Sequence, residues 1–272
     1  MDEELIPSYI QIDDIEVLTN NSQGSNSSYI TDAWFFVDGA DRGAYPLPAT
    51  IPYLGEGAHS IKVAPGIKLN GIAGTRVPYP LVEPEELDVE LFRDSIIDLN
   101  IRCNYYSTTK FALIEGFEDL NISFEETSTN TAEWRVTSRS SDPDDYVFEG
   151  SHSGGGFLND ENNRLQLVTK QFFTELPKNG IPAFIEMDFR ANTTFVLSIV
   201  GYISGVGDSD DLIYLNPTDG EWKKIYINLT SIISYDVNVN EYKFVISADH
   251  TNESTESVVL IDNFKILYRD ID

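Results

Sequence analysis

Two stretches near the end of the chain decide the fold class: Trp222-Lys-Lys-Ile-Tyr-Ile-Asn-Leu-Thr230 and Val258-Val-Leu-Ile-Asp-Asn-Phe-Lys-Ile-Leu-Tyr268. In both stretches apolar and polar residues alternate with a period of two, which is the pattern of half-buried β-strands. The second stretch carries a polar pair, Asp262-Asn263, inside otherwise apolar sequence. The end of the chain is therefore predicted to form two strands, one of them interrupted by this pair.

The same pattern continues outward from these two stretches. Eight or more short strand-like segments lie within the roughly 160 residues of 109–272, and no helical periodicity competes with them. Short strands at this density predict a jelly-roll β-sandwich. Residues 1–108 show short alternating segments between Pro and Gly turns, which predict a smaller, Ig-like sandwich. The predicted fold class is all-β, with one β-sandwich domain over 1–108 and a second over 109–272.

The closing strands of residues 109–272 resemble those of jelly-roll carbohydrate-binding modules. The resemblance implies a non-catalytic, galactose-binding-like domain whose partner is a polysaccharide or a glycoprotein glycan. It also implies a structural Ca²⁺ near the first and last strands of the domain. Glu118 and Asp262 are the expected metal ligands, since calcium takes carboxylate oxygens. The alternative is that Asp262-Asn263 forms only a bulge or a hydrogen-bonded pair.

The first half of the chain resembles a PEGA-like or Ig-like module. The resemblance rests on three successive stretches: Trp34-Phe-Phe-Val-Asp-Gly39, Gly43-Ala-Tyr-Pro-Leu-Pro48 and Leu54-Gly-Glu-Gly-Ala-His-Ser-Ile-Lys-Val63. Their order is similar to that in uncharacterised surface lipoproteins of Bacteroidetes-type bacteria. The resemblance implies export to the cell surface or periplasm and a lipid anchor on a Cys that is lost with the signal. It implies no activity.

The charge of the chain excludes several classes of partner. The sequence has 18 Lys and Arg against 45 Asp and Glu, a formal net charge of −27. Such a surface repels phosphate backbones and anionic lipid, so nucleic acid and direct membrane docking are not expected. Cations such as Ca²⁺ are compatible with it. The single cysteine, Cys103, excludes an internal disulfide framework and is expected to be a small buried residue.

The N-terminus gives no targeting signal of its own. Met1-Asp-Glu-Glu-Leu5 is acidic from the start, unlike the basic beginning of a signal peptide. Met1 is either a native start or a replacement for a removed export signal, and the lipoprotein resemblance favours the replacement. No segment approaches the roughly 20 apolar residues of a membrane span.

Glu186-Met-Asp-Phe-Arg190 is the strongest candidate site. Strand alternation places Glu186, Asp188 and Arg190 on one face, with the two acids about 7 Å apart. Laminarinase-type glycoside hydrolases use a similar strand, but they need a second Glu where this chain has Arg190. Because a retaining mechanism needs two carboxyl groups flanking the scissile bond, catalysis is not expected here. Arg190 is expected to pair with Glu186 or Asp188, on a face that contacts glycan hydroxyls.

Sugar-binding sites also use aromatic residues, whose exposed rings stack on the apolar face of a sugar. Trp134, flanked by charged residues, is a candidate ligand contact, whereas Trp222 is expected to pack at the edge of the sandwich. Four tyrosines near turns could also line a site, and the sequence does not choose among Tyr146, Tyr202, Tyr214 and Tyr235.

The sequence therefore predicts a non-catalytic binding protein, with a glycan as the favoured ligand. The predicted ligand contacts are Glu186, Asp188, Arg190 and Trp134. An adhesin or surface-assembly component that binds protein is the first alternative, and a large exposed apolar patch would favour it. A glycoside hydrolase is the second alternative, and it requires another carboxylate within about 5–10 Å of Glu186 or Asp188 in a cleft.

Overall fold

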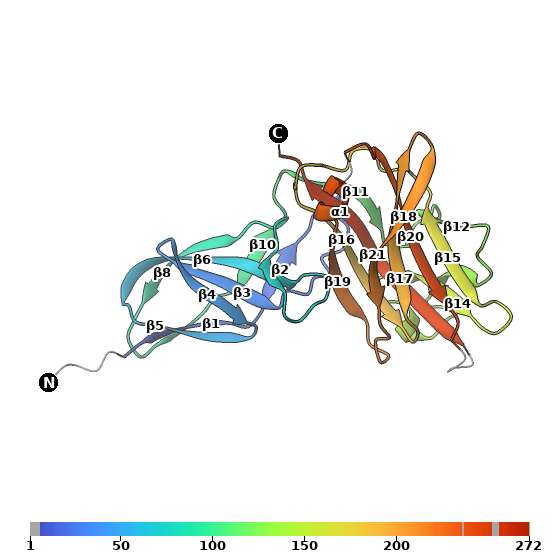
Figure 1. Cartoon of the computed structure of the whole chain (residues 1–272). Helices are drawn as coiled ribbons and strands as arrows, with labels where there is room; N and C mark the ends of the chain where they lie inside the picture. Colours follow the sequence, from blue (N-terminus) through green and yellow to red (C-terminus); the bar gives the residue numbers. More distant parts are fainter. Residues whose placement is uncertain (1–5, 236, 252–255, 272) are drawn as a thin grey trace. The chain divides into compact units, whose positions relative to one another are not determined.

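The chain folds into two compact units, each built of β-sheets (Figure 1). The computed structural model describes residues 6–235, 237–251 and 256–271. Unit 1 comprises residues 1–22 and 26–109, and unit 2 comprises residues 23–25 and 110–272. The short segment Gln23–Ser25 thus packs with the second unit, although its neighbours along the chain belong to the first. None of the described helices is long and apolar enough to cross a membrane.

Unit 1 is a small β-sandwich. Its strands form sheets of order β5-β1-β9, β10-β2 and β4-β3-β6-β7, and β8 also pairs with β6. Alternate side chains of these strands are fully buried and form the core, Phe35, Ile61 and Val63 among them. The ten strands are β1 (Ser8–Ile12), β2 (Ile15–Leu18), β3 (Asp32–Val37), β4 (Ala40–Pro46), β5 (Ala49–Tyr53), β6 (Gly57–Lys68), β7 (Arg76–Pro78), β8 (Glu85–Leu91), β9 (Ile96–Asp98) and β10 (Ile101–Asn104).

Cys103 lies in β10 and is buried, as the sequence predicted. Burial raises the pKa of its thiol to about 12, because the charged thiolate is disfavoured away from water. The thiol is therefore protonated at neutral pH and acts as a small apolar side chain.

Unit 2 is a sandwich of two larger sheets. One has the order β13-β14-β21-β16-β19, with β11 also paired to β21, and the other has the order β12-β15-β20-β17-β18. The elements are β11 (Thr109–Glu115), β12 (Phe124–Glu126), β13 (Glu133–Ser138), the 3₁₀ turn η1 (Asp144–Tyr146), β14 (His152–Leu158), β15 (Arg164–Thr169), β16 (Ala183–Ala191), β17 (Phe195–Ile203), β18 (Val206–Leu215), β19 (Lys223–Asn228), α1 (Thr230–Tyr235), β20 (Glu241–Asp249) and β21 (Ser257–Arg269).

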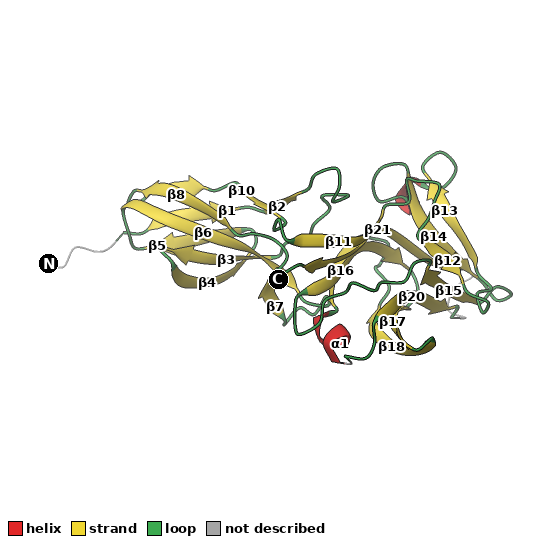
Figure 2. Cartoon of the chain, turned by 90° about the horizontal axis from the view of Figure 1, so that it is seen from above, coloured by secondary structure: helices red, strands yellow, loops and turns green. Residues whose placement is uncertain are grey.

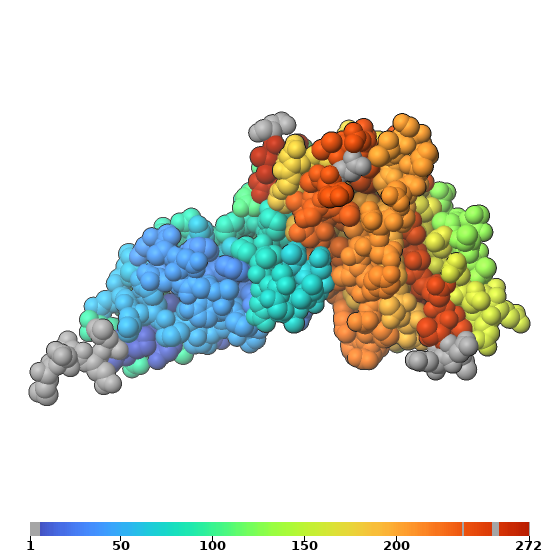
Figure 3. Space-filling model, viewed as in Figure 1, coloured from blue at the N-terminus to red at the C-terminus, as the bar shows by residue number. Residues whose placement is uncertain are grey.

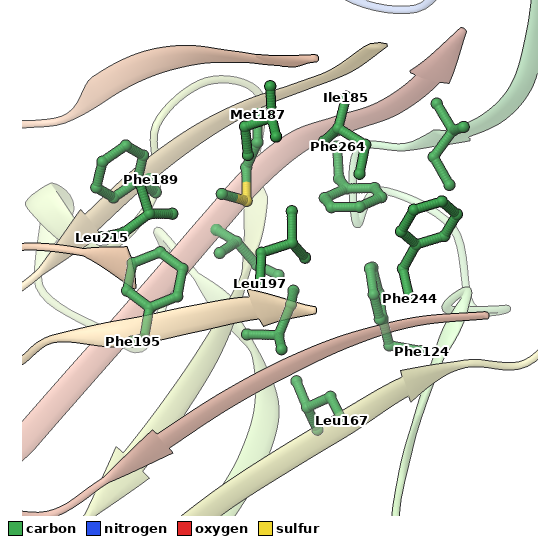
Figure 4. Close-up of a cluster of buried hydrophobic side chains, with 14 of the residues drawn as sticks. Phe124, Leu167, Ile185, Met187, Phe189, Phe195, Leu197, Leu215, Phe244 and Phe264 are labelled. Atoms are coloured by element: carbon green, nitrogen blue, oxygen red, sulfur yellow. The ribbon is translucent and has the colours of Figure 1, made fainter. Parts of the chain in front are cut away.

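The core of unit 2 lies between its two sheets, which form two layers in Figure 2. Each strand turns every second side chain inward, as strand geometry requires. Figure 4 shows Met187 and Phe189 of β16 facing Phe195 and Leu197 of β17 across this core. The all-β fold class predicted from the alternation is confirmed.

Gly154, Gly155 and Gly156 lie inside β14. The strand tolerates three glycines because its neighbours leave no room for side chains. A Cβ at Gly154 would lie 2.5 Å from the Trp134 ring, and one at Gly156 would lie 2.5 Å from the Leu165 side chain. The glycines therefore serve close packing between the sheets.

The polar pair in β21 does interrupt the strand pairing. The register between β16 and β21 shifts between Glu186 and Asp188, opposite the Asp262-Asn263 pair, and Asn263 has a φ of 48°. An extra residue in one strand of an antiparallel pair produces this kind of irregularity. The polar pair thus forms a β-bulge, and the structural Ca²⁺ expected near it stays a prediction.

Candidate functional site

The predicted acids lie on the outer face of the sheet β13-β14-β21-β16-β19. Glu186 and Asp188 are neighbours on one side of β16, as expected, but each is only 1% exposed. Lys224 of β19 places its Nζ 3.2 Å from Asp188 Oδ2 and 3.9 Å from Glu186 Oε2. Asn263 Nδ2 also donates to Asp188 Oδ2, at 3.0 Å. These carboxylates hold neighbouring strands together and are not displayed to solvent.

Arg190 does not pair with Glu186 or Asp188, so that prediction is wrong. Its guanidinium donates instead to the backbone oxygen of Asp145 at 2.8 Å and to the Asp145 carboxylate at 2.5 Å. A third hydrogen bond, 2.7 Å long, goes to the backbone oxygen of Gly220. Lys224 of the neighbouring strand takes the place beside the two acids that was expected for Arg190.

A loop covers one part of this outer face. Arg139 donates to the backbone oxygens of Phe148 and Gly150, at 3.0 and 2.9 Å, and so fixes the loop 139–151 in its folded form. The Tyr146 ring stacks on Phe157 with centroids 5.9 Å apart, and Trp222 contacts Phe148 as an edge residue. We call this surface the loop-covered face; a second small apolar core, including Phe157, Val258 and Leu260, lies there.

Trp134 belongs to the main core rather than to a ligand surface. It packs against the buried cluster between the sheets, and its ring meets Phe117 edge-on at a centroid distance of 6.1 Å. The side chain therefore points away from the face that carries Glu186. β13 turns this position inward, away from the two acids, and the role of Trp134 as a ligand contact stays a prediction.

The two expected calcium ligands are both engaged by the protein. Glu118 accepts hydrogen bonds from the backbone N–H of Ser151 and of His152, at 2.7 and 3.0 Å. Asp262 accepts one from Ser153 Oγ at 2.7 Å, and burial raises its pKa to about 7. Within the described residues no group of three or more His, Cys, Asp or Glu side chains is arranged to hold a metal ion. Calcium binding stays a prediction.

The opposite sheet presents a different surface. We call the outward side of β12-β15-β20-β17-β18 the open face. Cross-strand pairing arranges its side chains in rows that cross the strands. One row consists of Gln166, Ser247, Val196 and Tyr214. The neighbouring row consists of Val168, Val245, Ser198 and Asp211. The β17–β18 hairpin, which carries the end of these rows, lies within the orange part of the surface in Figure 3.

An aromatic ring stands at one side of the open face. Tyr214 is 62% exposed, and its hydroxyl donates to Asp211 Oδ2 at 2.5 Å. Ser198 Oγ donates to the other Asp211 oxygen at 2.8 Å. The two hydrogen bonds lower the pKa of Asp211, and the bond to this carboxylate raises the pKa of Tyr214. The ring is therefore held in a fixed orientation while its face meets solvent.

Polar groups accompany the ring across the sheet. Gln166 Oε1 accepts hydrogen bonds from the hydroxyls of Thr127 and Thr129, at 2.8 and 2.5 Å. Because the amide oxygen is used in this way, the Nε2 group is left as a donor. The Ser247 hydroxyl lies opposite Gln166 on the neighbouring strand. This row offers both hydrogen-bond donors and acceptors beside an aromatic plane.

A second aromatic group lies further along the strands. Phe172 is 48% exposed and meets Tyr202 edge-on at a centroid distance of 5.1 Å. Lys243 Nζ lies 4.7 Å from the Phe172 ring centroid and 3.6 Å from Glu125 Oε1. Tyr202 and Tyr214 were two of the four tyrosines that the sequence offered, and only the cross-strand register distinguishes among them. Phe172 carried no signal in the sequence that would have made it a candidate.

Comparison with known proteins gives structural neighbours only. No family model and no curated protein matches the chain. Among solved structures, it resembles the family 22 binding module in a structure of Clostridium thermocellum endo-1,4-β-D-xylanase 10B that also contains the catalytic module (TM-score 0.41, 10% identity, 60% of this chain). It also resembles the tandem family 22 modules of Paenibacillus barcinonensis xylanase 10C (TM-score 0.43, 13% identity, 60% of this chain). The chain spans only 29% and 47% of these two chains.

A third neighbour is a carbohydrate-binding module of the β-sandwich superfamily with promiscuous specificity. It matches at a TM-score of 0.39 and 14% identity, over 96% of this chain and 98% of the other. The neighbours are thus carbohydrate-binding modules with β-sandwich folds. At these identities and TM-scores the likeness assigns neither a ligand nor a site to this chain.

Proposed function

We propose that unit 2 is a non-catalytic glycan-binding module whose site is the open face. The observation that carries the proposal is Tyr214, an exposed ring fixed by Asp211 beside a row of polar side chains. An aromatic plane covers the apolar face of a sugar ring, and neighbouring amide and hydroxyl groups bond its hydroxyls. The open face supplies both kinds of contact on rigid strands.

The charge of this part of the chain favours a neutral glycan. Residues 111–272 hold 11 basic and 28 acidic residues, a net of −17. On the open face Lys243 is already paired with Glu125, and Arg164 with Asp249. An anionic polysaccharide would therefore be repelled by the net charge of the unit, and these two cations already have acidic partners.

The buried acids support a binding role over hydrolysis. Glu186 and Asp188 are ion-paired with Lys224 and hardly exposed, so they contribute to the stability of the sheet. Their assignment as ligand contacts is weaker than that of the open face for the same reason. Export, a lipid anchor and a structural Ca²⁺ remain part of the proposal, supported by the sequence resemblances alone.

The test is retention by immobilised polysaccharides. The full chain would be run through native gels containing xylan, galactan, mannan or mixed-linkage glucan, with polygalacturonate as the anionic comparison. We expect retardation by at least one neutral polysaccharide and none by polygalacturonate. Tyr214→Ala should weaken binding by about tenfold or more, the effect of losing one stacking ring.

Tyr235→Ala is the matched control. Tyr235 is 90% exposed and lies in α1, outside the open face, so its loss should leave retention unchanged. Equal behaviour of the two variants would place the site elsewhere. If no polysaccharide retards the folded protein, glycan binding is refuted and protein binding becomes the leading function.

A further inference from the structure

A polar pocket opens at one end of the open face. It has a volume of about 390 Å³ and is lined by Thr129, Thr131, Asn163, Arg164, Asp249 and His250. Arg164 begins β15 and lies directly opposite Asp249, which ends β20. The next row of the open face, two residues further along both strands, is Gln166 and Ser247. The pocket therefore continues the open face beyond its last row of aromatic and amide groups.

Arg164 and Asp249 give this pocket a donor and an acceptor side by side. Arg164 Nε donates to Asp249 Oδ1 at 2.8 Å, and both side chains are at least half exposed. Among the described residues, the Arg164 guanidinium uses only its Nε–H group, in the bond to Asp249. Its two terminal NH₂ groups can therefore donate to a ligand. Asp249 Oδ2 remains as an acceptor. Adjacent hydroxyls on a sugar ring, one accepting and one donating, match this pair.

The pocket is held in shape by bonds that do not use the ligand-facing groups. Thr131 Oγ1 accepts a hydrogen bond from the Arg164 backbone N–H at 3.0 Å. The His250 backbone N–H donates to the Asn163 backbone oxygen at 2.7 Å, and His250 Nδ1 lies 2.9 Å from Ser257 Oγ. Walls fixed in this way lose little conformational entropy when a ligand binds.

We propose that this pocket binds the terminal sugar residue of the glycan, through two adjacent free hydroxyls that contact Arg164 and Asp249. This proposal rests on the proposed function, and it adds that the pocket binds the end of the glycan chain. The volume falls within the range of about 300–1,000 Å³ typical of small-molecule sites. The lining supplies hydrogen bonds rather than an apolar stacking plane, so this position selects by hydroxyl geometry. The paired charges and Asp249 disfavour an anionic sugar.

The terminal position follows from the layout. Tyr214 lies on β18, two strands from β20, so at a strand spacing of about 4.8 Å it is about 10 Å across the sheet from Ser247. A glycan that stacks on Tyr214 and runs toward the pocket leaves the sheet when it reaches Arg164 and Asp249. A sugar residue bound there lies beyond the end of the stacking surface, with its hydroxyls directed toward Arg164 and Asp249.

The experiment is an NMR titration of the isotopically labelled full chain with the methyl glycosides of D-xylose, D-galactose, D-glucose and D-mannose. We expect at least one glycoside to shift the Arg164 Nε–Hε signal with saturation in the millimolar range. Arg164→Ala and Asp249→Asn should each weaken this binding by about tenfold, the loss of a charged hydrogen bond. Tyr235→Ala should leave it unchanged, since Tyr235 lies in α1 outside the open face, and thermal unfolding checks that each variant folds.

The outcomes separate this proposal from the proposed function. If polysaccharide is retained through Tyr214 but no glycoside shifts the Arg164 signal, the pocket proposal is overturned and the module remains a glycan binder. If a glycoside binds and Arg164→Ala has no effect, the pocket is likewise excluded. If a glycoside binds through Arg164 while no polysaccharide is retained, the pocket stands and the open face loses its assignment.

Discussion

The two outer faces of unit 2 differ in whether their acidic residues are buried or exposed. On the loop-covered face Glu186 and Asp188 are buried against Lys224, whereas on the open face Asp211 and Asp249 are exposed. Asp211 contacts Tyr214 only at its hydroxyl, so the exposed ring of this tyrosine can still contact a ligand. Asp188 is buried, and among the described residues its carboxylate contacts only protein groups. The same residue types therefore serve stability on one sheet and recognition on the other.

Burial explains why substitutions on the two faces should change the stability of the protein by different amounts. A buried ion pair gains stability only while both partners are present, because the remaining charge would otherwise be desolvated without compensation. An exposed pair is solvated in either case and contributes little. Mutations on the loop-covered face should accordingly change stability, and those on the open face should change binding.

The largest expected effect follows removal of Lys224. Lys224→Met removes the cation that is ion-paired with Asp188 and Glu186, while the buried Lys265 still interacts with both carboxylates. We expect the free energy of unfolding to fall by about 3 kcal/mol. Urea denaturation measures this change. Lys223→Met is the matched control, since Lys223 is the exposed neighbour in the same strand and should alter stability by less than about 0.5 kcal/mol.

A second substitution sharpens the interpretation. Asp188→Asn in the Lys224→Met background removes one uncompensated charge and should restore part of the lost stability. Equal stability of Lys224→Met and the wild type would mean that the carboxylates do not depend on this lysine. The contrast between the two faces would then lack its energetic basis.

Much of the fold could be predicted from the sequence because strand alternation is a local signal. The segments around Lys224–Leu229 and Val258–Tyr268 show it directly, and both are strands in the structure. The position of Gly154–Gly156 inside a strand could not be predicted in the same way, because the reason for these glycines is not local. Those glycines are required by Trp134 and Leu165, which are distant in sequence and meet them only after folding.

The site was harder to predict, since it depends on which sheet is covered. Alternation correctly placed Glu186 and Asp188 on one side of a strand, but it carries no information about Lys224 or the loop 139–151. The exposed Tyr214 was one of four equivalent tyrosines until the register of β17 and β18 placed it beside Asp211. Cross-strand neighbours, not composition, separate a buried ion pair from a binding surface.

A smaller effect concerns Asp262 on the covered side of the sandwich. Burial raises its pKa from 3.8 to about 7, and the nearby charge of Asp188 adds to the shift. The folded state keeps this proton between about pH 4 and pH 7 while the unfolded state loses it, so stability should fall as pH rises through that window. Asp262→Asn should flatten this part of the stability profile, measured by urea denaturation with chelator present. An unchanged slope in the variant would assign the pH dependence to other groups.

The smallest effect on stability is expected for Asp211→Asn on the open face. Asn keeps the shape of the side chain but weakens the hydrogen bond from the Tyr214 hydroxyl, since a neutral acceptor replaces a charged one. We expect unfolding free energy within about 0.5 kcal/mol of wild type, because the group is exposed. Affinity for the retained polysaccharide should fall by about two- to fivefold, less than for Tyr214→Ala, because the ring is still present but less firmly oriented. Affinity gels and urea denaturation on the same preparation measure both quantities. A loss of stability without a loss of affinity would reverse the distinction between the two faces, and an affinity loss as large as that of Tyr214→Ala would make Asp211 itself a ligand contact.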